Sequence, residues 1–226
     1  MPLPAAAMVT SHPEWFFDKN GALYGTTLFG AIVNSECPIG CGTVFQLVPT
    51  GSGPWKLDTI HSFAGSPSDV DHSYAHVTFD PIGNLYGTAG YGGQNTQNCS
   101  DCGGIFKLSL VNGGWQESVI YSFGKHTGSN PNAGLTLHKG ILYGSTSFGP
   151  QSRRDVGNGT VFAQRRGNQG PPTHHIIHVF TGGTDGYEPS SDLVFDKQGN
   201  AYGSTPYGGT NGTGDIFQLI PNGDGS

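Results

Sequence analysis

Gly83-Asn-Leu-Tyr-Gly-Thr-Ala89 is a short segment that recurs, with small changes, three more times along the chain. The other copies are Gly21-Ala-Leu-Tyr-Gly-Thr-Thr27, Gly140-Ile-Leu-Tyr-Gly-Ser-Thr146 and Gly199-Asn-Ala-Tyr-Gly-Ser-Thr205. Their tyrosines, Tyr24, Tyr86, Tyr143 and Tyr202, are 62, 57 and 59 residues apart. Self-similarity at a nearly constant period is the signature of a repeat architecture.

Three further blocks recur in phase with this segment. One block is GTVFQL at 42–47, GGIFKL at 103–108, GTVFAQ at 159–164 and GDIFQL at 214–219. Another ends in Phe63, Phe123 and Phe180. The last is an apolar stretch that closes on Asp18, Asp80 and Asp196, with His138 at this place in the third copy. Four blocks in four phased copies define a unit of about 55–60 residues.

Each block has the length, the aromatic and β-branched content and the Gly, Asn, Pro or Asp boundaries of a β-strand. In the second copy we expect strands a to d at 77–80, 84–89, 104–110 and 117–123. Four antiparallel strands repeated in tandem are typical of propeller blades, whereas solenoid repeats are usually about 20–45 residues long. The predicted fold is therefore all-β, a β-propeller-like array of four blades of about four antiparallel strands each.

We expect a single domain over residues 1–226, with repeats at approximately 13–63, 75–123, 133–180 and 191–220. The fourth copy stops where its strand d should begin. Either residues 1–12 supply that strand and close the array, or the last blade keeps an open edge. An open edge invites self-association, because its backbone groups are unpaired.

The blocks GNLYGT and GTVFQL, together with HVFTGGTDGYEP and SDLVFDKQGN, resemble the Gloeobacter/Verrucomicrobia-type tandem repeat of bacterial exported proteins. The resemblance covers residues 13–220 and implies a secreted or surface-anchored propeller-like array. It carries no agreed activity and no catalytic residues. The chain departs from the pattern at His138 and in the 64–74 loop.

Composition and charge exclude several classes of protein. Aromatic residues make up 11% of the chain and charged residues only 12%, so the 38 glycines mark turns rather than disorder. A net charge of −6, with 10 Lys and Arg, argues against a nucleic-acid partner. We expect no membrane span, because no run of 18 apolar residues occurs. The first twelve residues show no signal peptide, and the resemblance still favours a secreted or extracytoplasmic location.

The predicted b–c and d–a loops lie on one rim of such blades and are the long ones. They span 28–42, 90–103, 147–159 and 206–213 for b–c, and 64–74, 124–133 and 182–191 for d–a. Long loops on a rigid scaffold concentrate binding and catalysis, so this rim is the predicted functional face.

Four cysteines occupy two equivalent b–c loops, as Cys37-Pro-Ile-Gly-Cys41 and Cys99-Ser-Asp-Cys102. One local disulfide in each loop, suited to an oxidising compartment, is the favoured interpretation. Zinc bound by two pairs on adjacent blades, free thiols and cross-pairing are the alternatives.

Three loop histidines are candidate catalytic residues, His72, His76 and His126. A histidine titrates near neutral pH and can act as a general base or a metal ligand. We expect no cofactor, with a divalent metal at the His72/His76 loop as the alternative. A solvated loop with no site is the plainer interpretation.

Aromatic residues recur five positions after each repeat tyrosine, where they could stack on a sugar ring or simply pack between blades. The candidate ligand-binding residues are Phe29, Tyr91, Phe148, Tyr207, Arg153, Arg154, Tyr187 and Glu188.

Two functions remain open. The first is an extracellular recognition module that binds a glycan or another small polar ligand on the long-loop rim. The second is a polysaccharide-active lyase or hydrolase that uses a His, Tyr and Arg constellation on the same rim. Equivalent residues in every copy would favour a binder, and one asymmetric cluster would favour an enzyme.

Overall fold

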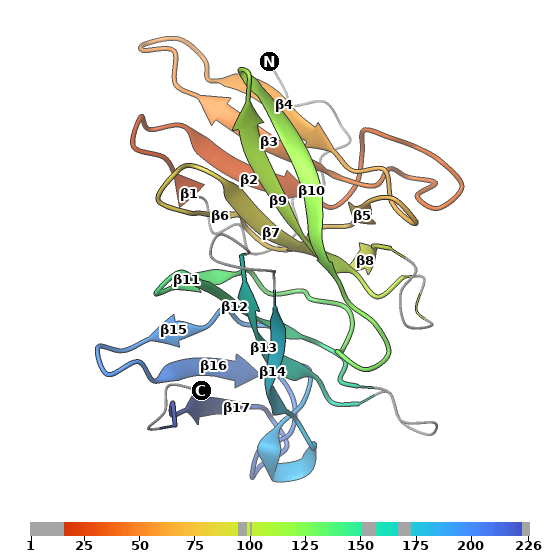
Figure 1. Ribbon diagram of the computed structural model, residues 1–226, viewed down its shortest axis with the longest axis vertical. Helices are drawn as coiled ribbons and strands as arrows, with labels where there is room; N and C mark the ends of the chain where they lie inside the picture. The colour runs from red at the N-terminus through yellow and green to blue at the C-terminus, as the bar shows by residue number, and fades with distance from the viewer. Residues whose placement is uncertain (1–15, 95–98, 100, 151–156, 167–172, 223–226) are drawn as a thin grey trace. The chain divides into compact units, whose positions relative to one another are not determined.

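The computed structural model describes residues 16–94, 99, 101–150, 157–166 and 173–222. Nearly all of the regular structure in these residues is β-strand, and one short 3-10 turn, η1 (Gly183–Asp185), is the helical element of the described part. The chain divides into two compact units, Met1–Phe123 and Gly124–Ser226. Each repeat forms its own small antiparallel sheet, so the predicted all-β, propeller-like array of four blades is confirmed (Figure 1).

The first unit contains two four-stranded blades and a short ribbon. The first blade has the order β1 (Phe16–Phe17), β2 (Leu23–Thr27), β3 (Thr43–Val48) and β4 (Lys56–Ser62). The second blade has the order β6 (Thr78–Phe79), β7 (Leu85–Ala89), β9 (Gly104–Val111) and β10 (Gly114–Ser122). The ribbon pairs β5 (Val70–Asp71) with β8 (Tyr91–Gly92).

The second unit contains the third and fourth blades. The third blade has the order β11 (Thr136–His138), β12 (Ile141–Thr146), β13 (Thr160–Arg165) and β14 (His174–Val179). The fourth has the order β15 (Val194–Phe195), β16 (Ala201–Thr205) and β17 (Asp215–Leu219), which are its three strands in the described residues. The closing strand that we expect from residues 1–12 falls outside the described residues, so closure and a single domain over 1–226 stay predictions.

The glycine of each LYG segment lies directly opposite the phenylalanine of the next block. Gly87 pairs with Phe106, and Gly25, Gly144 and Gly203 occupy the same position in the other blades. A Cβ on any of the four would overlap the facing phenylalanine ring. The two recurring motifs are therefore one packing unit, with the ring lying over the bare backbone of the adjacent strand.

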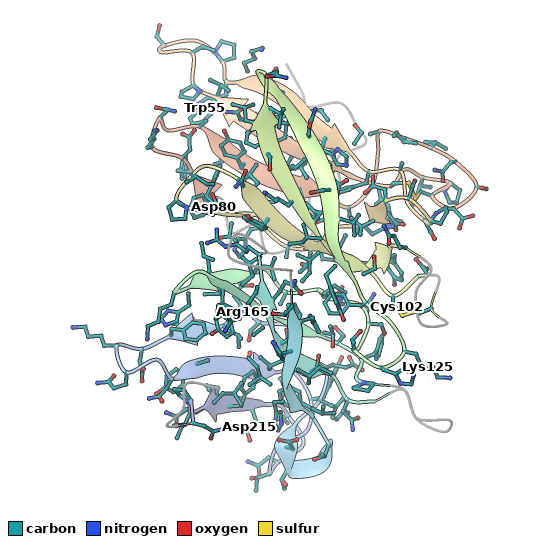
Figure 2. All side chains as sticks on the ribbon, in the orientation of Figure 1. Trp55, Asp80, Cys102, Lys125, Arg165 and Asp215 are labelled. Atoms are coloured by element: carbon teal, nitrogen blue, oxygen red, sulfur yellow. A yellow bond between two sulfur atoms is a disulfide. The ribbon has the colours of Figure 1, made fainter. Side chains whose placement is uncertain are left out.

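The recurring aspartate organises the turn between the first two strands of a blade. Oδ1 of Asp80 accepts the N–H groups of Ile82 and Asn84, both at 3.0 Å, and Oδ2 accepts the Tyr86 hydroxyl at 3.1 Å (Figure 2). Asp196 binds its turn and Tyr202 in the same way. One side chain thus closes the turn and also satisfies the hydroxyl of the repeat tyrosine.

The third blade lacks this aspartate because its turn is one residue shorter. His138 pairs directly with Ile141, and the two turn residues between them, Lys139 and Gly140, have φ values of 47° and 85°. Positive φ at both positions is typical of a type I′ hairpin, which differs from the longer turn that Asp80 caps. The His138 ring stacks on Phe195 instead, with 4.1 Å between ring centroids.

The core of the first unit is built from residues of both its blades. Val44 and Phe63 come from the first blade, and Leu85, Phe106 and Leu108 from the second, and all five are fully buried. Trp115 and Val119, on one face of β10, pack against this core. β10 begins at Gly114, three residues before the predicted strand, because a two-residue turn at Asn112–Gly113 starts the strand early.

Candidate functional site

A pocket of about 320 Å³ opens among the long loops of the first unit. Its lining comes from both b–c loops and from the d–a loop between the two blades, as predicted for the long-loop rim. The lining residues are Phe29, Glu36, Ser66, Asp71, His72, Tyr74, Tyr91 and Asp101. Three candidates from the sequence, Phe29, His72 and Tyr91, therefore lie in one pocket.

His72 is the centre of the contacts in this pocket. Its Nδ1 is hydrogen-bonded to a carboxylate oxygen of Asp71. Its ring also makes edge contacts with the rings of Phe29 and Tyr91, at centroid distances of 5.2 and 5.6 Å. The φ of His72 is 54°, in the left-handed region that few residues other than Gly adopt, although Asn, Asp and His do so more often than the rest. Strained backbone of this kind is concentrated at functional sites.

Hydrogen bonds from both blades hold the loop that carries His72. The Ser73 hydroxyl donates to the Thr88 carbonyl of β7 at 2.8 Å, and the Thr26 hydroxyl of β2 donates to the Ala75 carbonyl at 2.9 Å. The Thr27 hydroxyl donates to the Phe29 carbonyl at 2.9 Å. The pocket residues are therefore anchored to the central strands of two blades.

Both predicted disulfides are present, Cys37–Cys41 and Cys99–Cys102, and no described cysteine is free (Figure 2). Each bridge adjoins an acidic pocket residue, because Glu36 precedes Cys37 and Asp101 precedes Cys102. Asp101 Oδ1 also accepts the Gly92 N–H at 2.6 Å. The bridges stabilise the two loops that bring carboxylates to the pocket.

The pocket is acidic. Burial raises the pKa of Asp71, the hydrogen bond and charge of His72 lower it in part, and the nearby Asp101 and Asp69 raise it further. Burial, together with the neighbouring Tyr91, raises the pKa of Tyr74 to about 12, so its hydroxyl is protonated at neutral pH. Three carboxyl groups and no Lys or Arg stand among the described residues that line the pocket.

The second unit repeats the backbone of this site with other side chains. Tyr187 forms a β-bridge with Tyr207, as Asp71 does with Tyr91. The next residue, Glu188, has a φ of 58° and corresponds to His72. The rings of Tyr187 and Tyr207 stack with 5.2 Å between centroids, and 47% of Tyr207 is exposed.

Other predicted site residues lie elsewhere. His76 is half-buried and is not part of the pocket lining. His126 is exposed and belongs to the second unit, as does Phe148, which bridges to Ser129. Arg153 and Arg154 fall outside the described residues. The catalytic and ligand-binding roles of all these residues stay predictions.

Sequence reasoning missed Glu36, Tyr74 and Asp101 as site residues. The position of Glu36 and Asp101 beside the cysteines could have indicated them, because a disulfide holds the adjacent residues of its loop in a fixed place. The alternative of a metal at the His72/His76 loop stays a prediction. Asp71 and His72 group there with Cys37, whose sulfur is engaged in a disulfide.

No helix in the described part of the chain is long and apolar enough to cross a membrane. No curated protein matches the sequence. Among solved structures, the chain is similar to a glycoside hydrolase family 43 arabinoxylan arabinofuranohydrolase from Bacillus subtilis, crystallised with cellotetraose. The identity is 17% and the TM-score 0.49, over 91% of this chain and 45% of that protein, so the chain spans less than half of its length. The sequence profile of the Gloeobacter/Verrucomicrobia repeat matches residues 99–226, more than half of the chain, and the protein belongs to that repeat family.

Proposed function

We propose that the protein is an extracellular recognition module whose first-unit pocket binds a neutral saccharide. The observation that carries the proposal is the pocket lining, which combines the aromatic rings of Phe29, Tyr74 and Tyr91 with three carboxyl groups. Aromatic rings pack on the apolar faces of sugars, and carboxylates accept hydrogen bonds from hydroxyl groups. A volume of about 320 Å³ suits a ligand of one or two rings.

Charge narrows the class of saccharide. A uronate would bring its own carboxylate next to Glu36, Asp71 and Asp101, with no Lys or Arg in the lining to pair with it. Like charges at close range in a partly buried site repel one another strongly. Neutral sugars are therefore favoured over polyuronates. The two disulfides suit the oxidising conditions outside the cytoplasm.

The alternative function is catalysis on a neutral glycan, and the Asp71–His72 pair is the observation that favours it. A carboxylate bound to Nδ1 orients a histidine, and the other ring nitrogen, Nε2, could then act as a general base. This enzymatic alternative does not require Arg153 or Arg154, which the sequence predicted as part of the candidate site. A lyase acting on uronates is disfavoured, because such a reaction requires a cation near the substrate carboxylate.

Equilibrium binding of labelled oligosaccharides tests the proposal. The panel contains neutral cello-, xylo- and manno-oligosaccharides and, as the charged comparison, oligogalacturonates. We expect a neutral glycan to bind, and Tyr91→Ala to weaken it by about 0.5–1.5 kcal/mol. His72→Asn should weaken it by about 0.5–1.5 kcal/mol without loss of stability, because Asn tolerates positive φ. The matched control is His175→Asn, since His175 is exposed on β14.

Stronger binding of oligogalacturonate than of every neutral glycan would contradict the proposal. Release of reducing ends from a bound glycan, abolished in His72→Asn, would replace the binding role with the enzymatic one. If His76→Ala abolishes the release of reducing ends and His72→Asn does not, the catalytic histidine is His76.

A further inference from the structure

We propose that His61, Asp69 and Glu117 form a binding site for a divalent transition metal, of which Zn²⁺ is the best match. His61 lies on β4, Glu117 on β10 and Asp69 in the loop that precedes β5. One ligand atom of each residue lies within 4.8 Å of the other two. Strands from two blades and the loop that leads to the pocket therefore converge on one point.

Two of the three ligand atoms have no hydrogen-bond partner in the described part of the chain. His61 Nε2 and Glu117 Oε1 are both buried and make no such bond, although His61 Nε2 lies within ion-pair distance of the Asp69 carboxylate. A buried polar atom without a hydrogen-bond partner is destabilising and rare in folded proteins. A metal ion would satisfy both atoms at once.

The surroundings shield the three side chains from much of the water. The His61 and Asp69 side chains are 19% and 10% exposed. The Phe63 ring lies edge-on to His61 at 4.9 Å, and Trp115 and Val119 flank Glu117 on the inward face of β10. Burial, together with the charge of Asp69, raises the pKa of Glu117 to about 7, and His61 offsets only part of this rise. A divalent cation would remove the repulsion between the two carboxylates.

The geometry of Asp69 is already that of a ligand. Its Oδ1 accepts the Val70 N–H at 2.7 Å, and its Oδ2 accepts the Ala64 N–H at 2.8 Å, so the carboxylate is fixed. Its Oδ2 lies 3.4 Å from His61 Nε2. Two ligands bound tetrahedrally to zinc at about 2.0–2.1 Å are about 3.4 Å apart.

The donor set decides which metal fits. One imidazole and two carboxylates suit zinc, and zinc sites with three protein ligands, as in catalytic sites, hold a water in the fourth position. Calcium needs about 6–8 oxygen ligands, which this cluster does not supply. Because Asp69 precedes Asp71 by two residues, metal binding would also stiffen the loop of the proposed saccharide pocket. The metal site does not depend on that function.

Isothermal titration of the chelator-treated, intact protein with Zn²⁺, Mn²⁺ and Ca²⁺ tests the site. We expect one Zn²⁺ per chain, weaker Mn²⁺ and no Ca²⁺ binding, with a higher Tm when zinc is present. Glu117→Gln keeps the shape but removes a ligand oxygen, and should lower zinc affinity at least tenfold. His175→Ala, which removes an exposed histidine, should leave zinc affinity unchanged.

Visible absorption of Co²⁺ added to the same protein gives a second readout, because four-coordinate Co²⁺ absorbs strongly. We expect a tetrahedral spectrum that Asp69→Asn and Glu117→Gln abolish. Both variants are checked for folding by circular dichroism, and Asp69→Asn serves if Glu117→Gln does not fold. Zinc binding of equal affinity in both variants, or no zinc binding by the unmodified protein, would overturn the proposal.

Discussion

The two compact units share one loop geometry but use it differently. In the first unit, Asp71 pairs with Tyr91 and is followed by His72. In the second unit, Tyr187 pairs with Tyr207 and is followed by Glu188. The φ values of the residues after the bridge, 54° and 58°, are nearly the same. The repeat therefore determines the backbone, and the side chains placed on it determine the chemistry.

The two units carry different side chains at the bridge position. Asp71 is 4% exposed and leaves the space beside Tyr91 open, where the pocket lies. Tyr187 instead stacks on Tyr207, so the two aromatic rings contact each other. The proposed saccharide pocket therefore lies in the first unit, and the second unit has the partly exposed ring of Tyr207 at the equivalent place.

The largest expected effect concerns the phenylalanine that faces the LYG glycine. Phe106 is fully buried, whereas its counterpart Phe217 is only partly buried. Phe106→Ala should therefore reduce the free energy of unfolding by about 3–5 kcal/mol, and Phe217→Ala by clearly less. Chemical denaturation of the two variants measures the difference. Equal losses would show that the units are equally well packed.

The two units also differ in their disulfides, because all four cysteines belong to the first unit. Removal of a disulfide has the next largest expected effect. Replacing Cys37 and Cys41 by Ser should destabilise the loop by about 2 kcal/mol, since the bridge closes a short loop. Saccharide affinity should fall with it, as Glu36 loses its fixed place. Thiol titration of the denatured, unreduced protein should find no free cysteine. Four reactive thiols would contradict the bridged state.

Substitution of the exposed apolar side chains of the fourth blade should have a smaller effect, and it should change self-association rather than folding. Ile216 and Val194 are 77% and 67% exposed, and β17 is the last strand of its described sheet. Self-association through this edge is our proposal, because unpaired strand edges join other chains. Ile216→Lys should shift the protein toward monomer in sedimentation equilibrium. Deletion of residues 1–12 should strengthen association if they cover the edge.

The smallest effect concerns the turn aspartate and its pH dependence. Burial opposes ionisation of Asp80, but hydrogen bonds from Asn84, Tyr86 and Ile82 outweigh it and lower the pKa. Since the folded-state pKa lies below the unfolded value, the stabilisation is present above about pH 4 and is lost as pH falls further. Asp80→Asn should flatten this acid loss in pH-dependent unfolding. The same acid loss in wild type and variant would assign it to other carboxylates.

Much of the fold could be predicted from the periodic motifs. A glycine opposite a phenylalanine and an aspartate that caps a turn are local requirements, so they recur in the sequence wherever the structure recurs. The third copy has His138 in place of the turn aspartate, and this departure is visible in the sequence. Its cause is a turn that is one residue shorter, which only the strand register shows. The sequence did not predict the early start of β10, because the glycines at 113 and 114 indicate a turn rather than the first residues of a strand.

By itself the sequence predicted the blades and the long loops, favoured the two local disulfides, and gave Phe29, His72 and Tyr91 as candidates, because loop lengths and repeat positions carry that information. Only the tertiary structure decided which residues meet. Asp71 and Tyr74 join the pocket while His76, four residues beyond His72, does not, because the direction of each loop side chain depends on backbone angles. His61 and Glu117, 56 residues apart in the sequence, meet because two blades pack face to face. Some contacts between blades do recur, as between Phe63 and Phe106 and between Phe180 and Phe217. Glu117 differs from its equivalents in the first and third blades, so its meeting with His61 appears only in the folded chain.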